Sequence, residues 1–161
     1  MILFLILLLI FILFLLLMIG VLRTWQVQHD RRQQIFLCGK IPKQLPDGFY
    51  RGSATGYRGA WQGKKFDRSR KSGLNILLTG GKPKEKFPFV TYVGQGESDQ
   101  IQVIKIDYNI SSNSWWLKLI LDEIVAVNPH KYLGKVHLIL PLGIVFSLGY
   151  FSLERASGMI T

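Results

Sequence analysis

The side chains that could do acid–base or nucleophilic chemistry are few and scattered along this sequence. Asp107 falls on the polar face of an expected strand and Asp122-Glu123 at an expected strand end, so we predict solvated carboxylates rather than general acids or bases. Cys38 lies in a linker with no histidine fixed beside it, which disfavours a catalytic thiol. These residues predict no active site, and we expect a protein that is not an enzyme.

The histidines support the same interpretation. His137 alternates with Val136 and Leu138, so we expect it to face solvent together with Lys135, and His130 follows a proline in a turn. A Gly-x-Ser-x-Gly nucleophile motif is absent from the sequence. Three histidines and one cysteine, widely separated, favour neither a metal site nor a disulfide, and no motif calls for a cofactor.

The most specific local pattern is Gly59-Ala60-Trp61-Gln62-Gly63-Lys64. It is not a phosphate-binding loop, because three residues rather than four separate the glycines and Lys64 is followed by Lys65. Glycines on both sides of Trp61 free the backbone, so that the ring could lie across the end of a barrel while the strand bends. The alternative is an ordinary core tryptophan beside turn glycines.

The string Gly59-Ala60-Trp61-Gln62-Gly63 resembles the first-strand signature of lipocalins and other calycin barrels. It also resembles the GXWXG-type small proteins, a lipocalin-like group of unknown function. In lipocalins a basic residue after the last strand packs on this tryptophan and closes the barrel, and Arg155 is the matching residue here. The resemblance implies a lipocalin-like barrel closed by Gly59, Trp61, Gly63 and Arg155.

These residues must be positioned by a domain that follows an apolar leader. Residues 2–22 carry no charged side chain and, as a helix, would span about 31 Å, close to the thickness of a hydrocarbon core. The alternative is a cleaved signal peptide, but the run is too long, no basic residue precedes it, and a small-x-small cleavage site is missing. We therefore expect an uncleaved single-pass anchor.

The charges that follow the apolar run predict its orientation. Basic residues dominate the next stretch, with Asp30 as the sole acid among them, and positive residues stay cytoplasmic. We therefore expect the N-terminus outside and the globular domain in the cytoplasm, with Trp25 as an interfacial aromatic anchor. The flanking basic residues are Arg23, Arg31, Arg32, Lys40 and Lys43.

Composition changes divide the chain into three parts. Residues 1–22 form the anchor, residues 23–46 a helical extension (Thr24 to about Gln34) and a linker, and residues 47–161 the globular domain. Two prolines, Pro42 and Pro46, favour extended backbone in the linker. The globular part is long enough for one domain with its own core.

Apolar residues in the globular part alternate with a period of two. Ile104, Ile106 and Tyr108 share one face of an expected strand, and Gly-rich turns separate this strand from similar ones. Residues 115–127 suit either a helix or a strand, and we favour strand because their neighbours are strands. The pattern predicts a mainly β fold of seven or eight antiparallel strands, a barrel or a sandwich, with the closed barrel favoured because it leaves no edges.

A closed barrel of this kind would have an apolar interior that could hold a ligand. We expect that interior to be lined by residues of three strands, and a filled core would refute a ligand cavity. The expected lining residues are Ile104, Ile106, Tyr108, Val136, Leu138, Phe146 and Leu148.

The net charge of +10 is unevenly distributed. Residues 23–86 hold 15 Lys and Arg against 4 Asp and Glu, whereas residues 87–161 hold 5 against 6. Solvated hairpin loops would explain the excess, and so would contact with an anionic membrane surface. Nucleic acid is disfavoured because the aromatics lie on strands of balanced charge. The expected membrane-surface residues are Trp25, Arg23, Arg31, Arg32, Lys64, Lys65, Arg68, Arg70 and Lys71.

Trp115 and Trp116 are adjacent, so on a strand their side chains would point to opposite faces. One ring could enter the core, and the other would contact the membrane, a partner or a ligand.

Three functions fit these observations. The first is a membrane-anchored barrel, not an enzyme, that binds an apolar or lipid-like ligand at an anionic membrane surface. The second is an accessory or scaffold subunit of a larger complex, with the helix packed against integral membrane partners and the barrel docked on the surface. The third, least favoured, is an enzyme acting on a lipid-like substrate, which would need a convergent polar cluster in the barrel mouth.

Overall fold

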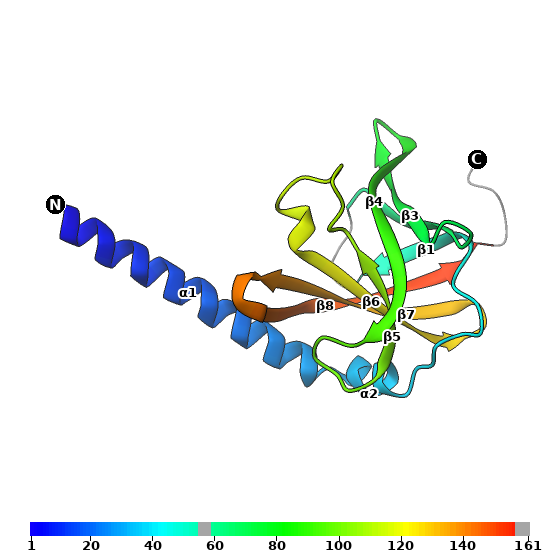
Figure 1. Cartoon of the computed structure of the whole chain (residues 1–161), viewed down its shortest axis with the longest axis horizontal. Helices are drawn as coiled ribbons and strands as arrows, with labels where there is room; N and C mark the ends of the chain where they lie inside the picture. The colour runs from blue at the N-terminus through cyan, green and yellow to red at the C-terminus, as the bar shows by residue number, and fades with distance from the viewer. Residues whose placement is uncertain (55–58, 157–161) are drawn as a thin grey trace.

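A computed structural model of the chain describes residues 1–54 and 59–156. Two helices precede the sheet, α1 (Ile2–Gln28) and α2 (Arg31–Leu37), and two short 3₁₀ turns lie later, η1 (Leu117–Leu119) and η2 (Pro141–Gly143). Figure 1 shows α1 projecting from one side of the sheet structure, with α2 tucked beneath it. The strands are β1 (Gly48–Ala54), β2 (Trp61–Asp67), β3 (Ser72–Thr79), β4 (Lys82–Gln95), β5 (Gln102–Asp107), β6 (Ile120–Asn128), β7 (Lys131–Leu140) and β8 (Ile144–Arg155).

The eight strands form a closed antiparallel barrel in the order β1 to β8, which confirms the expected fold class. Each strand pairs with the next in sequence, and β1 closes the barrel by pairing with β8 from Tyr50↔Arg155 to Ala54↔Phe151. Residues 115–127, which suited either a helix or a strand, begin with a short 3₁₀ turn and continue as β6. The preference for strand is confirmed from Ile120 onward.

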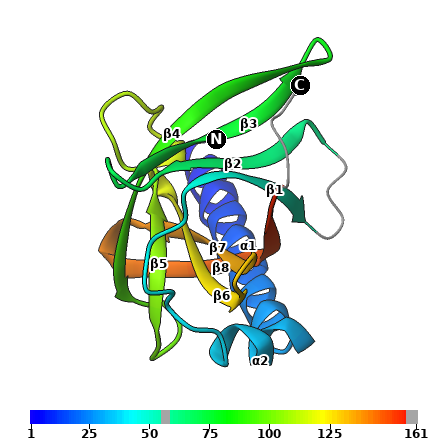
Figure 2. The ribbon, with the colours of Figure 1, turned by 90° about the vertical axis from the view of Figure 1, so that its right-hand side faces the viewer.

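Alternation places one set of side chains inside the barrel. Aromatic rings fill much of this interior and meet edge to face: Tyr50 with Phe66 at 5.6 Å between centroids, Phe66 with Phe89 at 5.4 Å, and Phe89 with Tyr108 at 5.7 Å. Such pairs add to the stability that burial of the rings already provides. The opposite faces of β5–β8 are covered by the two helices, as Figure 2 shows for α1.

Helix α1 covers a part of β8 that β1 does not reach. The pairing with β1 extends over Phe151–Arg155, and α1 packs beside the first half of β8. There the Arg23 Nε donates to the Leu148 carbonyl at 2.7 Å, and the Ser147 N–H donates to the Thr24 hydroxyl at 3.0 Å. Backbone groups at a strand edge need partners, and the end of α1 supplies them.

The expected helical extension from Thr24 to about Gln34 is broken in the structure. Helix α1 ends at Gln28, and α2 begins after Asp30, whose side chain accepts from the Arg32 N–H at 2.8 Å. Asp is a preferred residue at this capping position because its carboxylate satisfies an otherwise free N–H of the first turn. The cap restarts the helix in a new direction and brings Phe36 against the barrel wall, where it is fully buried.

The turn between β7 and β8 has an unusual backbone. Leu142 adopts φ +67° and Gly143 φ +76°. The left-handed region costs a non-glycine residue about 1 kcal/mol, and the Leu142 side chain is 98% exposed. In water this leucine would gain nothing from burial to offset its strain.

Gly63 is the glycine of the Gly59–Lys64 pattern with a clear steric role. It adopts φ +139°, beside a register shift in the β2–β3 pairing, and a Cβ placed on it would lie 2.0 Å from the Tyr50 carbonyl oxygen. The strand therefore bends next to Trp61 as expected, and any side chain at position 63 would push β1 away from β2.

We predict that Gly63→Ala lowers the free energy of unfolding by at least about 2 kcal/mol, because strain and overlap with β1 act together. Chemical unfolding of the full chain in detergent, followed by circular dichroism, would measure the loss. Gly81→Ala is the matched control: Gly81 also has a positive φ (+75°) but has open space around it. Equal losses in the two variants would contradict the steric argument.

Candidate functional site

The barrel interior contains a cavity of about 320 Å³ beside a group of buried polar side chains. Four of these side chains are Lys64 on β2, Asn75 on β3, Asp122 on β6, and Tyr108, which directly follows β5. We call these four residues the interior polar cluster. Their neighbours around the cavity are Ala54, Trp61, Val136 and Phe151.

Lys64 is the centre of the interior polar cluster. Its ammonium nitrogen lies 2.9 Å from Asp122 Oδ2 and 3.0 Å from Asn75 Oδ1, and it also donates to the Tyr108 hydroxyl. An ammonium group has three N–H bonds to donate, so these three partners use all of them. The side chain is 3% exposed, which makes this a buried ion pair within a hydrogen-bonded network.

The remaining members complete the network. Asn75 Oδ1 accepts from the Trp61 indole N–H at 3.0 Å, and its Nδ2 donates to the Tyr108 hydroxyl at 3.0 Å and to the Phe87 carbonyl at 3.1 Å. Tyr108 in turn donates to Asp122 Oδ2 at 3.1 Å. A buried polar network is stable only when its members are satisfied in this way.

Aromatic rings surround the Lys64 ammonium. Its nitrogen lies between 5.1 and 5.6 Å from the centroids of four rings, which is cation–π distance. Burial lowers the pKa of Lys64, and the Asp122 carboxylate counteracts that effect. Burial also raises the pKa of Tyr108 well above its usual value, with Asp122 adding to the effect. The rings belong to Trp61, Phe89, Tyr108 and Phe151.

Asp122 presents an acceptor toward the cavity. Its contacts with Lys64 and Tyr108 both use Oδ2. Among the described residues, every buried side-chain nitrogen or oxygen without solvent contact has a hydrogen-bond partner. Oδ1, for which the described part of the chain supplies no partner, therefore borders open space, and Asp122 lines the cavity. The interior polar cluster thus leaves a carboxylate oxygen available and no spare Lys64 proton.

A second hollow, of about 430 Å³, lies between the barrel and α1. Ala54, Val136 and Phe151 border both this hollow and the interior cavity. The lining of the second hollow includes Arg23, which directly follows the apolar part of α1, and Arg32 of α2. Two guanidinium groups therefore border a hollow that shares three wall residues with the interior cavity.

The expected lining residues are only partly inside. Ile104, Ile106 and Tyr108 belong to the interior core, Val136 lines the cavity, and Leu138 follows it on the inner face opposite Ile120. Phe146 lies opposite Leu138 in the β7–β8 pairing and so shares its face, but its ring packs against Gly20 of α1 rather than lining the cavity. Leu148 is a correction, because it lines the hollow beside α1 instead of the interior cavity. A register shift between Val136 and His137 displaces β8 there, which a strict period of two does not reveal.

The expected closure by Arg155 is also corrected. Arg155 is exposed and lies opposite Tyr50 in the β1–β8 pairing, whereas Lys64 is the cation over the Trp61 ring, at 5.6 Å. Trp61 packs edge to face on Phe151. Gly59 is an exposed residue just before β2. Backbone pairing between β1 and β8 therefore closes the barrel without the cation–π contact that the lipocalin resemblance implied.

Among the expected membrane-surface residues, Lys64 is wrong because it is buried inside the barrel. Lys65, Arg68, Arg70 and Lys71 are exposed around the β2–β3 turn, which antiparallel topology places at the end of the barrel opposite the β7–β8 turn. Figure 1 shows the β7–β8 turn beside α1 and the β2–β3 turn far from it. Arg23, Trp25, Arg31 and Arg32 remain near the end of the apolar run.

A second buried polar group lies outside the barrel wall, between β5–β8 and the helices. Lys135 donates to Gln33 Oε1 at 2.8 Å and forms an ion pair with Asp99, and Gln33 Nε2 donates to Asp99 Oδ1 at 2.6 Å. Lys135 is completely buried, with its nitrogen 4.5 Å from the Phe36 ring centroid. The expectation that Lys135 faces solvent was wrong, because α2 covers this face of β7.

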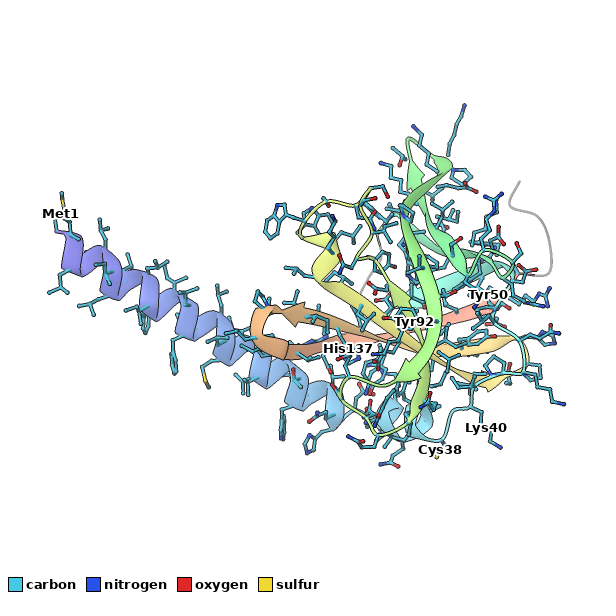
Figure 3. All side chains as sticks on the ribbon, in the orientation of Figure 1. Met1, Cys38, Lys40, Tyr50, Tyr92 and His137 are labelled. Carbon is cyan, nitrogen blue, oxygen red and sulfur yellow. The ribbon has the colours of Figure 1, made fainter. Side chains whose placement is uncertain are left out.

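His137 and Glu123 were also expected in solvent, and both are completely buried. His137 Nε2 lies 3.1 Å from Glu123 Oε2, and its Nδ1 lies 3.2 Å from the Ser147 hydroxyl oxygen. Figure 3 shows His137 where the barrel meets α1. Ser147, His137 and Glu123 are linked in the same series of contacts as a hydrolase triad. However, Ser147 has no exposed surface, and its backbone N–H donates to the Thr24 hydroxyl of α1. The arrangement holds the helix rather than a substrate.

Within residues 1–54 and 59–156, no group of three His, Cys, Asp or Glu side chains could hold a metal ion. Comparison with protein-family models, with curated proteins and with solved structures finds no match to this chain. The lipocalin resemblance of the Gly59–Gly63 string therefore stays a prediction.

We predict that Lys135→Ala destabilises the chain by about 3–5 kcal/mol, because it leaves the Asp99 carboxylate buried without its cation. Chemical unfolding in detergent would measure the change. Lys131→Ala, on the same strand but exposed, is the matched control and should change stability by less than about 0.5 kcal/mol. A small, equal effect of both variants would show that the ion pair contributes nothing to the docking of α2.

The Asp30 cap predicts a pH dependence. Hydrogen bonds from Arg32 lower the pKa of Asp30 from 3.8 to about 2, so its stabilisation is present above about pH 4 and is lost as the pH falls toward 2. Asp30→Ala should cost about 1 kcal/mol at pH 7 and progressively less below pH 4. Thermal unfolding of the unmodified chain and of Asp30→Ala across this pH range tests the direction of the pH dependence. Glu154→Ala, at an exposed position, is the control. A cost that grows in acid would contradict the assignment.

Proposed function

We propose that this chain is a single-pass membrane-anchored barrel that binds a small amphipathic, lipid-like molecule in its interior. The observation that carries the proposal is the 320 Å³ cavity beside the interior polar cluster. Small-molecule sites commonly measure about 300–1,000 Å³ and combine apolar walls with a few placed polar groups. The cavity is at the lower end of this range, so the ligand is small.

Helix α1 would be the membrane anchor. Among the described residues, α1 is the one helix long and apolar enough to cross a membrane, and its large apolar side chains are 40% or more exposed from Met1 to Leu22. Figure 3 shows them projecting freely. Val27 is buried in the outer core, and Gly20, Arg23 and Thr24 contact β8. A helix so integrated with the barrel favours a retained anchor over a cleaved signal peptide.

The chemistry of the cavity restricts the ligand. Lys64 has no proton left to donate, whereas Asp122 Oδ1 can still accept. A hydroxyl or amine donor therefore suits the site better than a carboxylate, which would face a carboxylate oxygen. The apolar body would contact Val136, Phe151 and Trp61.

The source of the ligand follows from the second hollow. Because this hollow shares Ala54, Val136 and Phe151 with the cavity and opens beside α1, it offers a path between the bilayer and the interior. Arg23, Arg31 and Arg32 follow the apolar run, so positive residues would keep the barrel on the cytoplasmic side of the membrane. We propose that the ligand is a membrane-derived alcohol or amine.

Binding of 1-decanol to the full chain in nanodiscs tests this function. We expect one bound molecule by native mass spectrometry, and weaker binding of decanoate. Val136→Phe should fill the cavity and reduce decanol binding at least about tenfold.

Val127→Phe is the matched control, because Val127 carries the same side chain on exposed surface of β6. It should leave binding unchanged, whereas the decanol that still binds Val136→Phe measures how much adheres to α1 and the lipid. Equal binding in the two phenylalanine variants would overturn the proposed function, and preference for decanoate would overturn the assignment of Asp122 as the acceptor.

A further inference from the structure

The hairpin that joins β7 to β8 ends in a long uncharged stretch. Residues 138–146 read Leu-Ile-Leu-Pro-Leu-Gly-Ile-Val-Phe, and we call them the β7–β8 tip. Leu142 at its end is 98% exposed and Ile144 is 40% exposed. A soluble turn normally carries polar residues, so this apolar tip needs an apolar environment.

The β7–β8 tip lies alongside the apolar part of α1. A Cβ on Gly20 would lie 2.8 Å from the Phe146 ring, so ring and helix backbone are in direct contact. One turn further along, Arg23 binds the Leu148 carbonyl. Figure 1 shows the turn of the hairpin beside α1, pointing toward the N-terminal side of the helix. The tip therefore extends beyond Arg23, on the side where the uncharged run lies.

We propose that the β7–β8 tip enters the same membrane leaflet as α1 and forms a second membrane contact. The inference rests on the anchor part of the proposed function and needs no ligand. If α1 spans a bilayer, Arg23 marks the polar boundary and Gly20 lies just inside it. Phe146 shares the level of Gly20, and the residues beyond it must then be in lipid.

The depth of the tip is limited by its backbone. From Phe146 to Leu142 the strand is at most about 13 Å long, and Figure 1 shows the hairpin inclined to α1, which reduces the depth further. Strand edges are not tolerated in the hydrocarbon core because their N–H and C=O groups lack partners there. The tip therefore occupies the interfacial layer, at a depth of about 5–10 Å.

Two exposed tryptophans support this orientation independently. Trp115 is 76% and Trp116 is 49% exposed, in the connection between β5 and β6. In an antiparallel meander the β5–β6 and β7–β8 connections lie at the same end of the barrel. Tryptophan is enriched where water meets lipid, so this end of the barrel is suited to face the bilayer.

Site-directed fluorescence tests the proposal on the full chain in phosphatidylcholine vesicles. In a Cys38→Ser background, Leu142→Cys carries the environment-sensitive dye NBD. We expect blue-shifted emission, and quenching by lipids with a doxyl group near the headgroup at least about threefold stronger than for a label in water. Soluble iodide should quench this label weakly.

Two further labels make the outcomes distinguishable. His130→Cys lies in the exposed β6–β7 turn at the opposite end of the barrel and should report water, and Leu13→Cys in α1 should report the hydrocarbon core. A lipid signal at 13 with a water signal at 142 would overturn the tip insertion alone. Water signals at both positions would overturn the anchor, and with it this inference.

Discussion

The structure depends on how the unpaired half of β8 is covered. A barrel has no free strand edge only when its first and last strands pair along their whole length. Here β1 pairs with Phe151–Arg155, and the earlier part of β8 receives α1 instead. Arg23 and Thr24 supply the hydrogen bonds that a strand would otherwise make. The apolar helix is therefore part of the barrel wall as well as a leader in front of it.

This substitution of a helix for a strand has a direct consequence for the polar groups on the outer wall. Lys135, His137 and Glu123 would be solvated on a free barrel, but the helices and the β4–β5 connection exclude water from them. Each is then paired, because an isolated charge without water would be strongly destabilising. Lys135 binds Asp99 and Gln33, and His137 joins Glu123 to Ser147. Loss of α1 or α2 would expose these groups to water.

The sequence was sufficient for the architecture, because period-two alternation and turn glycines are local signals. It also correctly predicted that Ile104, Ile106 and Tyr108 lie in the barrel interior. It failed where a distant element decides burial: nothing near Lys135 or His137 in the sequence indicates that a helix 100 residues earlier covers them. It also failed at Leu148, where a register shift in β8 breaks the period of two.

The interior polar cluster could have been found by a stricter use of the same periodicity. Lys64 is two residues from Phe66, and Asp122 is two residues from Ile120 and Ile124, so each shares a face with apolar residues. A charged residue of each sign on inward faces predicts a buried ion pair, which is the one arrangement that tolerates both. The prediction of a surface role for Lys64 came from counting charges along the chain without asking which face they occupy.

The ion pair and the edge of β8 together explain why the cavity lies where it does. Lys64 and Asp122 hold each other in place among aromatic rings, so neither side chain can move to fill the adjacent space. On the other side, Gly149 stands opposite Val136 in the β7–β8 pairing and adds no side chain, close to where α1 replaces a strand. Rigid polar groups on one wall and a helix-covered gap on the other leave an interior that is open toward α1. Beyond the ion pair, where Phe66 and Phe89 pack edge to face, aromatic rings fill the interior instead.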